Sequence, residues 1–584
     1  MPTNSIEKDA LPAGRVTELT EAIESVLRYV TPFLRTSEDD YDALTAKRQL
    51  SYGCYSTGNI LQSYLSHPDQ LRERLSLDLP QTGQGLEAIA SSTSTLLRYS
   101  INTSSPGFMD KLWSSPSVPG IAADLLLSAL NGNDHVFRVS PALTLIEKHV
   151  GEELAHLFGL GDSNSGGITV PGGAAANSTA LLIARNVRFP HLKEVGLHGI
   201  SSPRLVIFAS DAAHFSVFNA AQVLGLGSHS VKKISTTTDG SMDPRALKQA
   251  LDATIAAEEV PLFICGTAGT TVRGAYDPLE SIGKLAHEYN AWFHVDACWG
   301  GAAAFSDKLT YKLAGCELAD SIAYNPHKLL GVPQICSFLL GKDLRTFWYA
   351  NSLTAGYLFH QGHSISPSDL CSSPITAAFE GELSNNHVEK PSYLDSVHYN
   401  WRTSKAIQNA PDPRELYDLA SFTPQCGRRP DAVKLYFHWR YYGTEGIAKQ
   451  VEGAYDGAKY LARLIEEEPS LHLVGGVDVP CTQVCFYYVG TSLKLTGSAQ
   501  DRAMQNTHFT RLISAGLMKR GWMVDYAPGS GRQEELGDFL RIACNRMTTP
   551  CVAEGLVQVI SEVVSSDIET ITTPTKVILP EMEG

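Results

Sequence analysis

The chain has 584 residues, more than a single hydrophobic core normally serves, so two or three structural units are expected. Hydrophobic residues make up 43% of the chain and charged residues 19%, which is ordinary for a soluble globular enzyme. The formal net charge is −15, and no basic block interleaved with aromatic residues is present, so binding to nucleic acid or to an anionic membrane is not expected.

The start of the chain and the cysteines predict a cytoplasmic protein. Residues 1–15 contain Glu7, Lys8 and Asp9 and have no apolar core, so a secretory signal is not expected. No run approaches the eighteen or so apolar residues of a membrane span. The eleven cysteines are scattered through apolar segments, which is typical of reduced thiols. Cys481 and Cys485 have no second cysteine pair or nearby histidine, so no metal site is predicted.

Apolar spacing predicts the first elements along the chain. Residues 16–34 have the pattern of an amphipathic helix, which packs on its own domain or lies across a partner subunit. Residues 143–158 predict a second helix, which ends at Gly159. Short apolar runs then predict strands at 205–209, 262–266, 292–296 and 335–340. Nearly continuous apolar strands that alternate with helices indicate an α/β fold with a largely parallel sheet covered on both faces.

The last part of the chain changes character twice. Residues 360–425 are rich in Ser, Pro, Asn and His and form either a lid-like insertion or, in part, unremoved intervening sequence. After Cys426, helices near 430–441 and 446–466 and a strand at 484–489 predict a smaller α+β domain. The expected division is an N-terminal helical segment at 1–114, a large domain at 115–425 with the insertion 360–425, and a small C-terminal domain at 426–584.

A lysine and an aspartate point to the chemistry. Lys328 ends the sequence Asn-Pro-His-Lys just after an apolar run, and Asp296 ends another apolar run upstream. Pyridoxal 5′-phosphate needs a lysine that forms an imine with its aldehyde and a carboxylate that keeps its pyridine nitrogen protonated. Taken singly, the lysine is more often a solvated charge and the aspartate a helix cap. Together with the motifs that follow, they predict a pyridoxal phosphate site in the large domain.

Three further segments suit this cofactor. Residues 169–177 place two adjacent glycines before an apolar helix, where backbone N–H groups and the helix dipole favour a phosphate, although a tight turn alone would explain them. His214 follows the strand 205–209 and can lie flat on the pyridine ring, although a lone histidine is more often structural. Residues 267–271 supply hydroxyls beside the ring, and Asn325 and His327 can donate to the phosphate or to the substrate.

Five motifs occur in an order and spacing that resemble the group II pyridoxal-phosphate-dependent amino-acid decarboxylases. They are Pro171-Gly-Gly, Ser-Asp-x-x-His214, Thr-Ala-Gly-Thr-Thr271, His-Val-Asp-Ala-x-Trp-Gly-Gly301 and Asn-Pro-His-Lys328. The resemblance is strongest to the glutamate, aspartate and cysteine sulfinate decarboxylase branch and runs from about Ser105 to beyond Arg541. It implies a type I pyridoxal-phosphate-dependent transferase fold: a mostly parallel seven-stranded sheet with helices on both faces and a small C-terminal α+β domain. It also implies a homodimer with active sites at the subunit interface.

The resemblance assigns roles by motif position. Lys328 is the imine lysine, Asp296 is the partner of the pyridine nitrogen and His214 stacks on the ring, and these three are expected to be catalytic. Tyr357 lies in a segment, Ala355-Gly-Tyr-Leu-Phe359, that resembles the mobile catalytic loop and its proton donor. Related aldehyde-forming enzymes tend to carry phenylalanine there, so the tyrosine favours plain decarboxylation. The predicted cofactor-binding residues are Lys328, Asp296, His214, Gly173, Ala174, Ala175, Thr270, Asn325 and His327.

The predicted substrate-binding residues are Phe108, Asp110 and Arg541. Arg541 lies in Phe-Leu-Arg-Ile, which resembles the segment whose arginine holds a substrate carboxylate. Residues 105–110 occupy the position of the family's pocket segment, but they lack its arginine and carry Asp110 in place of an asparagine. This change makes the local charge more negative and therefore favours a diamino acid somewhat over an acidic one.

The predicted function is α-decarboxylation of a small L-amino acid. The leading substrates are aspartate, which gives β-alanine, glutamate, which gives GABA, and cysteine sulfinate. The alternatives are an L-2,4-diaminobutyrate decarboxylase, an aminotransferase or aldehyde synthase on the same fold, and a catalytically inactive binding subunit. The expected partners are an amino-acid substrate and a second copy of the chain, with no nucleic acid and no membrane.

Overall fold

The computed structural model describes residues 15–46, 67–75, 77–113, 115–197, 204–352, 399–490, 498–529 and 536–568. The chain forms two compact units. The first comprises Met1–Lys111, Thr507–Tyr526 and Thr549–Gly584, and the second comprises Leu112–Asn506 and Ala527–Thr548. The three-part division at residues 114 and 425 stays a prediction. None of the helices in the described ranges combines the length and the apolar character needed to cross a bilayer.

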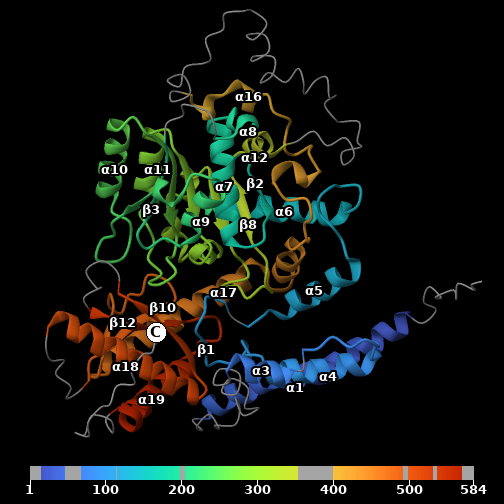
Figure 1. Ribbon diagram of the computed structural model, residues 1–584, viewed down its shortest axis with the longest axis vertical. Coiled ribbons are helices and arrows are strands. Elements are labelled where there is room, and N and C mark those ends of the chain that lie inside the picture. The colour runs from blue at the N-terminus through green and yellow to red at the C-terminus, as the bar shows by residue number, and fades with distance from the viewer. Residues whose placement is uncertain are drawn as a thin grey trace, which may run out of the picture. The chain divides into compact units, whose positions relative to one another are not determined.

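The second unit is built on a seven-stranded sheet with the order β2-β8-β7-β6-β5-β3-β4 (Figure 1). Strands β4, β3, β5, β6 and β7 run parallel, whereas β8 is antiparallel to both β2 and β7. The sheet is therefore largely parallel, as predicted. The strands are β2 (Gly166–Thr169), β3 (Leu205–Ser210), β4 (Val231–Ile234), β5 (Val260–Thr267), β6 (Trp292–Asp296), β7 (Ser321–Tyr324) and β8 (Phe338–Gly341).

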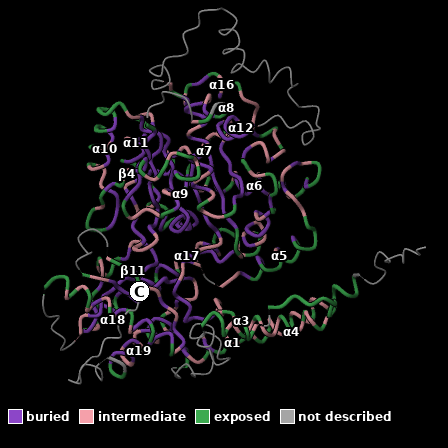
Figure 2. The backbone as a smooth tube through the Cα atoms, in the orientation of Figure 1, coloured by how far each residue is buried: buried purple, intermediate pink, exposed green. Residues whose placement is uncertain are grey.

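Apart from β2, each strand of this sheet contributes to two hydrophobic cores, because successive side chains point to opposite faces. On β3, Val206 and Phe208 belong to one core, while Leu205 and Ile207 belong to the other. The first core also contains residues of α6, α10, α11 and α17, and the second contains residues of α7, α9 and α12. The sheet forms the buried centre of this unit (Figure 2). Helices therefore cover both faces, which confirms the predicted fold class.

The helices that the sequence predicts at 143–158, 430–441 and 446–466 are present in the second unit. The predicted helix 143–158 is α6, which is followed by Gly159 with a φ of +79°. The helices predicted near 430–441 and 446–466 are the two arms of α17, which departs from helical geometry at Gly443. The helices are α5 (Val118–Leu130), α6 (Pro141–Leu157), α7 (Gly173–Arg188), α8 (Leu192–Val195), α9 (Ser216–Val223), α10 (Pro244–Ala256), α11 (Leu279–Glu288), α12 (Leu344–Asn351), α16 (Lys405–Gln408) and α17 (Ala432–Glu467). Short 3-10 turns are η1 (Ser228–Ser230), η2 (Gly300–Phe305), η3 (Thr310–Leu313), η4 (Cys316–Leu318), η5 (Trp401–Thr403) and η6 (Leu419–Phe422).

A small antiparallel sheet completes the second unit, with β10 (Gln483–Tyr488) between β9 (Leu471–Leu473) and β12 (Asp538–Ala543). The strand predicted at 484–489 is β10. In the first unit, β1 (Phe108–Met109) runs parallel to β11 (Met523–Pro528), and the amphipathic helix predicted at 16–34 is α1 (Arg15–Thr45). The remaining elements are α3 (Pro68–Leu75), α4 (Gly85–Arg98), α18 (Ala499–Lys519), α19 (Pro550–Val563) and the π-helical turn η8 (Val564–Ile568). The division between the units falls within α18 and β11.

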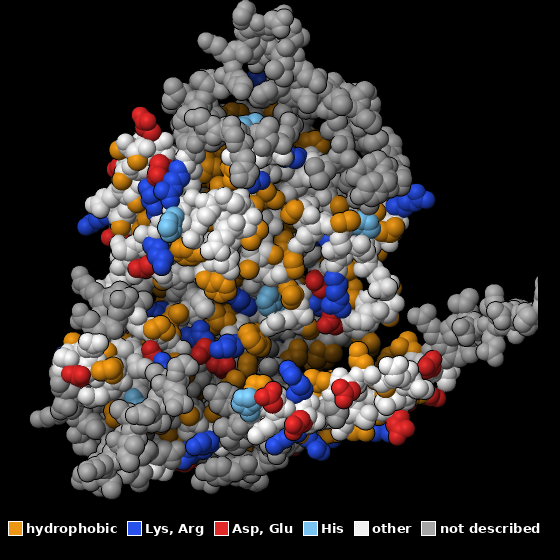
Figure 3. All heavy atoms as spheres, viewed as in Figure 1, with side chains coloured by type: hydrophobic (Ala, Val, Ile, Leu, Met, Phe, Trp, Pro, Cys, Tyr) orange, Lys and Arg blue, Asp and Glu red, His pale blue; other side chains and the backbone are white. Residues whose placement is uncertain are grey.

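Charged side chains of both signs are interspersed with hydrophobic ones over the face that Figure 3 shows. The coloured residues of that face therefore present a mixed surface rather than a field of a single sign.

A buried charge cluster ties α6 and β2 to the segment that precedes α17. Glu147 and Arg428 form an ion pair whose side chains are 0% and 1% exposed. Glu147 also accepts from the backbone N–H of Thr169 at 2.8 Å and from its hydroxyl at 2.7 Å. Arg428 donates to the carbonyl of Thr169 at 3.2 Å and to that of Asp134 at 2.6 Å. The carboxyl group of Asp134 accepts from the hydroxyl of Thr144 at 2.7 Å, so it lies in the same cluster.

We expect the wild-type protein to become less stable as the pH rises toward neutrality, and we expect Asp134→Asn to show less of this pH dependence. Burial, followed by the charge of Glu147, raises the pKa of Asp134 from 3.8 to about 7. A carboxyl group with a higher pKa in the folded state stabilises the fold fully below its unfolded pKa, and this contribution is lost as the pH rises through the folded pKa. Denaturation at about pH 5 and about pH 8 should therefore show a difference of a few kcal/mol in the wild type and a smaller one in the variant. The same pH dependence in both proteins would contradict this assignment.

Candidate active site

Residues with ionisable or polar side chains lie close together at the carboxyl ends of the parallel strands. Asp296 ends β6, and its register partners are Thr267, the last residue of β5, and Ala323 on β7. Lys328 lies in a tight turn after β7, in which its backbone N–H donates to the carbonyl of Asn325 at 3.0 Å. The carboxyl ends of parallel strands all lie on the same side of a sheet, and ligands of such sheets bind there. The structure therefore brings Asp296 and the Lys328 turn to one side of the sheet.

Asp296 is held as a carboxylate although it is buried. Its two oxygens accept from the side-chain amide of Asn177 at 3.0 Å and from the backbone N–H of Cys298 at 3.1 Å. Burial alone would raise the pKa of Asp296, but the positive charge of Lys328 and these two hydrogen bonds hold it below its usual value of 3.8. An ionised carboxylate in a buried site can stabilise a cation such as a protonated pyridine nitrogen.

Asn177 connects Asp296 to two histidines. Its amide nitrogen also donates to the hydroxyl of Ser216 at 2.8 Å, and Ser216 in turn bonds Nδ1 of His214 at 2.8 Å. Its amide oxygen accepts from Nε2 of His294 at 2.9 Å. Burial lowers the pKa of His214, and it lowers the pKa of His294 to about 4. Both imidazoles are therefore neutral near pH 7, and their tautomers follow from this network.

Gly173, the first residue of α7, lies close to the side chains of Cys298 and Asn325. A Cβ atom on Gly173 would lie 2.5 Å from Sγ of Cys298 and 2.9 Å from Nδ2 of Asn325, so only glycine fits there. Ala174 and Ala175 follow in the first turn of α7, where backbone N–H groups have no partner within the helix. The amide oxygen of Asn325 is buried and has no hydrogen-bond partner among the described residues. The cradle thus has small residues and a helix N-terminus, which fit a phosphate group.

Thr270 and His327 are both anchored to backbone groups. The hydroxyl oxygen of Thr270 accepts from the backbone N–H of Ala275 at 3.0 Å. Nδ1 of His327 lies 2.7 Å from the carbonyl of Cys336, and burial lowers the pKa of His327 to about 4. His327 is therefore a neutral imidazole that is anchored to the segment just before β8. A role for either residue in cofactor binding stays a prediction.

The predicted substrate residues divide between the two units. Arg541, on β12 of the second unit, is 5% exposed and donates to the carbonyl of Thr271 at 3.1 Å. Phe108 and Asp110 lie in the first unit and are both buried. Tyr357 lies outside the described residues. The structure thus joins Arg541 to the segment 267–271, which carries Thr270.

The sequence reasoning did not identify Asn177, Ser216, His294 or Gln483 as site residues. Asn177 follows Gly173 by one turn of α7, so its position on the helix was a usable signal. The others are recognisable only from long-range contacts.

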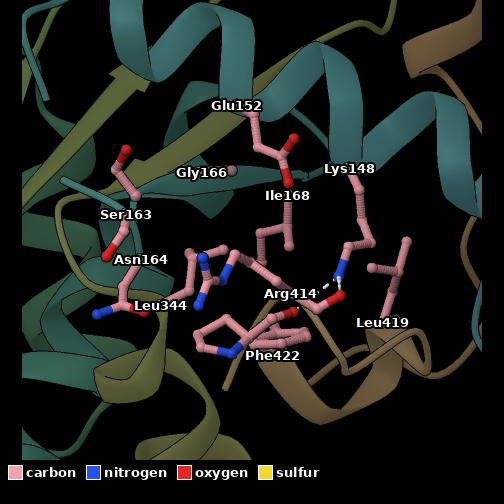
Figure 4. Close-up of a pocket in the computed structure, with 13 residues that line it drawn as sticks. Lys148, Glu152, Ser163, Asn164, Gly166, Ile168, Leu344, Arg414, Leu419 and Phe422 are labelled. Atoms are coloured by element: carbon pink, nitrogen blue, oxygen red, sulfur yellow. Dashed lines mark hydrogen bonds between the residues drawn. The ribbon is translucent and has the colours of Figure 1, made fainter. Parts of the chain in front are cut away.

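A surface pocket elsewhere in the second unit has a different character (Figure 4). Lys148 and Glu152 of α6 line it together with Arg414 and Phe422. Nζ of Lys148 donates to the carbonyls of Pro413, Arg414 and Leu416, at 2.7, 3.3 and 2.6 Å. No residue predicted to bind the cofactor lines this pocket, and its lysine is engaged by backbone oxygens, so it is not the active site.

Comparisons with known proteins agree with this geometry. The pyridoxal-dependent decarboxylase conserved domain matches residues 68–375 and 408–489. A glutamate decarboxylase-like protein of Gibberella zeae is 47% identical over 497 residues, which cover 85% of this chain and 91% of that protein. An L-aspartate decarboxylase of Metarhizium robertsii is 36% identical over 544 residues, which cover 93% of this chain and 96% of that protein.

A solved structure shares the fold. The structure of Oryza sativa TDC with PLP and tryptamine has a TM-score of 0.75 at 20% identity and covers 95% of this chain and 99% of that chain. The family match extends over more than half of the chain, and the two relatives cover most of it. The chain therefore belongs to the pyridoxal-dependent decarboxylases, carboxy-lyases that use pyridoxal 5′-phosphate, and has their type I α/β fold.

Proposed function

We propose that this decarboxylase removes the α-carboxylate of a small acidic L-amino acid as CO2. The candidate substrates are aspartate, glutamate and cysteine sulfinate. The names of the two relatives support an acidic substrate, because one is an L-aspartate decarboxylase and the other is glutamate decarboxylase-like. The observation that carries the reaction type is the buried carboxylate of Asp296, which accepts from Asn177 at 3.0 Å and from the backbone N–H of Cys298 at 3.1 Å. It ends β6, the strand beside β7, which the Lys328 turn follows.

The residues have separate tasks in this proposal. Lys328 would hold the cofactor aldehyde, and Asp296, oriented by Asn177, would accept a hydrogen bond from the protonated ring nitrogen. His214 would pack on the ring as a neutral imidazole, and Arg541 would bind a substrate carboxylate. The phosphate is held by Gly173, Ala174, Ala175 and Asn325, with Thr270 and His327 nearby. When bound, pyridoxal phosphate supplies the electron sink that receives the electrons of the broken bond to CO2.

Tyr357→Phe should lower amine formation by roughly a hundredfold or more. In our proposal the phenol of Tyr357 donates the proton that replaces CO2 on the α-carbon, and phenylalanine has no proton to give. Product amine should be measured by chromatography, together with the aldehyde, ammonia and peroxide that the variant is expected to form instead by consuming dissolved oxygen. Tyr311→Phe is a suitable control, because Tyr311 is 68% exposed. Unchanged amine formation in Tyr357→Phe would show that the proton donor is another group.

The structure of the first unit bears on the rival diamino-acid substrate. The sequence favoured a diamino acid somewhat, because Asp110 adds negative charge to the pocket segment. However, Nζ of Lys111 lies 3.3 Å from the carboxylate of Asp110 and 2.8 Å from that of Asp525. Asp110 is therefore already paired with a cation, which weakens the argument for a second substrate ammonium group. An aminotransferase or an aldehyde synthase on the same fold stays a rival for the reaction type.

We further propose that the protein is a cytoplasmic homodimer with interface active sites. Helix α5 buries Ala123 and Leu127 against Val433 of α17. It also exposes large apolar side chains, as expected of a surface that another chain covers. These side chains are Val118, Ile121, Leu125, Leu126 and Leu130. Analytical ultracentrifugation of the cofactor-loaded protein tests this proposal, and a monomer at micromolar concentration would contradict it.

The experiment that tests the proposed function is a substrate panel. The cofactor-loaded protein is incubated with each of the common amino acids, cysteine sulfinate and 2,4-diaminobutyrate, and the CO2 released is measured. We expect release from aspartate, glutamate or cysteine sulfinate and much less from the others. Preferred release from 2,4-diaminobutyrate, or from an aromatic amino acid, would overturn the acidic substrate class.

A further inference from the structure

The side-chain amide of Gln483 connects three segments of the active site. Its oxygen accepts from Nε1 of Trp299, three residues after Asp296, at 2.9 Å. Its nitrogen donates to the carbonyl of Thr270 at 3.0 Å and to the carbonyl of Thr271 at 3.3 Å. Gln483 is 2% exposed, so these contacts form in a buried environment. A single amide thereby joins the ends of β5 and β6 to the small sheet that contains β10.

The same contacts lead directly to Arg541. Gln483 is the first residue of β10, and two residues further along this strand Cys485 is the register partner of Arg541 on β12. The carbonyl of Thr271, which accepts from Gln483, also accepts from Nη1 of Arg541 at 3.1 Å. A carbonyl shared by two donors couples their positions, so a change at Gln483 is transmitted to the guanidinium group of Arg541.

The chemistry of the partners fixes the orientation of this amide. The indole N–H of Trp299 can only donate and the two carbonyls can only accept, so the oxygen and nitrogen of Gln483 cannot exchange places. Gly274 allows the close approach, because a Cβ atom there would lie 2.4 Å from the amide oxygen. The φ of Gly274 is +69°, which glycine adopts without strain. The turn that contains Thr270 and Gly274 thus has room and acceptors for the Gln483 side chain.

We propose that Gln483 is a positioning residue that fixes the guanidinium group of Arg541 for binding of the substrate carboxylate, an inference that rests on the proposed role of Arg541. A guanidinium group recognises a carboxylate through two parallel hydrogen bonds, so its plane must be held in one orientation. Loss of the amide leaves the carbonyl of Thr271 with Arg541 as its one side-chain donor among the described residues and leaves the indole N–H of Trp299 without the acceptor Gln483. The contacts of Asp296 with Asn177 and Cys298 do not involve Gln483, and neither does the bond of the Thr270 hydroxyl to Ala275. We therefore expect the cofactor side of the site to change less than Arg541.

The test compares Gln483→Met with Gln483→Glu. Methionine has a similar volume and makes none of the three hydrogen bonds, whereas glutamate keeps an acceptor for Trp299 and loses both donors. Binding of succinate, a dicarboxylate without an amino group, to the cofactor-loaded protein is measured by calorimetry. The KM and kcat for the preferred amino acid and the affinity for pyridoxal phosphate are measured beside it. The control is Gln450→Met in α17, because the amide oxygen of Gln450 has no partner among the described residues.

Both Gln483 variants should bind succinate about tenfold more weakly and show a similar rise in KM, with kcat and cofactor affinity changed far less. The Gln450→Met control should match the wild type. Unchanged succinate affinity in either folded Gln483 variant would overturn the inference, as would an equal loss of cofactor affinity, which indicates a general structural role. Arg541→Met separates the two proposals. If it leaves succinate binding unchanged, the proposed role of Arg541 fails, whereas an effect of Arg541→Met alone overturns only the role of Gln483.

Discussion

Lys328→Ala is expected to reduce CO2 release to less than about a thousandth of the wild-type rate, because it removes the amine that binds the cofactor aldehyde. Lys328 lies in the turn after β7, and its charge lowers the pKa of the neighbouring Asp296. Loss of the lysine therefore removes both the covalent attachment and the cation that stabilises the aspartate. The visible absorbance of the bound cofactor should change at the same time, which a spectrum of the purified variant will show.

The control for this prediction is Lys284→Ala. The side chain of Lys284 on α11 is 69% exposed, and its substitution should leave turnover and absorbance unchanged. Reduction of the wild-type protein with borohydride should attach the cofactor to the peptide that contains Lys328, as read by mass spectrometry. Label on a different lysine, or normal turnover in Lys328→Ala, would mean that this residue has been assigned the wrong role.

The largest effect on stability is expected from Arg428→Ala, which should lower the free energy of unfolding by roughly 3–5 kcal/mol. The substitution leaves the carboxylate of Glu147 buried, at 0% exposure, without its cation. It also removes the donor to the carbonyls of Asp134 and Thr169. Buried charges that lose their partner cost several times more than exposed ones, so the effect should exceed that of an ordinary surface substitution.

The neighbouring Arg429 offers a matched control. Its side chain is 43% exposed and pairs with Asp124 at 2.7 Å, so Arg429→Ala should cost about 1 kcal/mol or less. Urea denaturation of both variants, followed by circular dichroism, measures the two effects under one condition. Equal destabilisation by the two substitutions would show that the ion pair of Arg428 with Glu147 does not hold the segment before α17 in place.

Much of the cofactor side of the site could be predicted because it is local in sequence. The apolar run 292–296 matches β6 residue for residue, and Asp296 stands at its carboxyl end. Other residue types that the cofactor requires also lie within a few residues of a strand end, as His214 does after β3 and Lys328 after β7. Strand β2 was missed because Gly166 and Gly167 are poor strand formers. Their place in the sheet depends on packing, since a Cβ atom on Gly167 would lie 2.5 Å from the side chain of Leu340.

The positioning residues could not be predicted, because their partners are distant in sequence. Asn177 bonds Asp296 across 119 positions, and Gln483 bonds Thr270 across 213. No local pattern distinguishes such polar residues from ordinary helix or strand residues. The buried contact of Arg428 with Glu147 likewise emerges only from the folded chain. Sequence therefore points to candidate catalytic groups more readily than to the residues that hydrogen-bond them.

The central claim, that the chain is a carboxy-lyase for an acidic amino acid, is tested most directly by the stoichiometry of its products. The cofactor-loaded protein is incubated with the preferred acidic amino acid, and CO2, product amine, ammonia and peroxide are quantified from the same reaction. We predict equal amounts of CO2 and amine, with ammonia and peroxide at the level of a protein-free control. Ammonia and peroxide in amounts equal to CO2, or consumption of an acidic amino acid without CO2, would contradict the account.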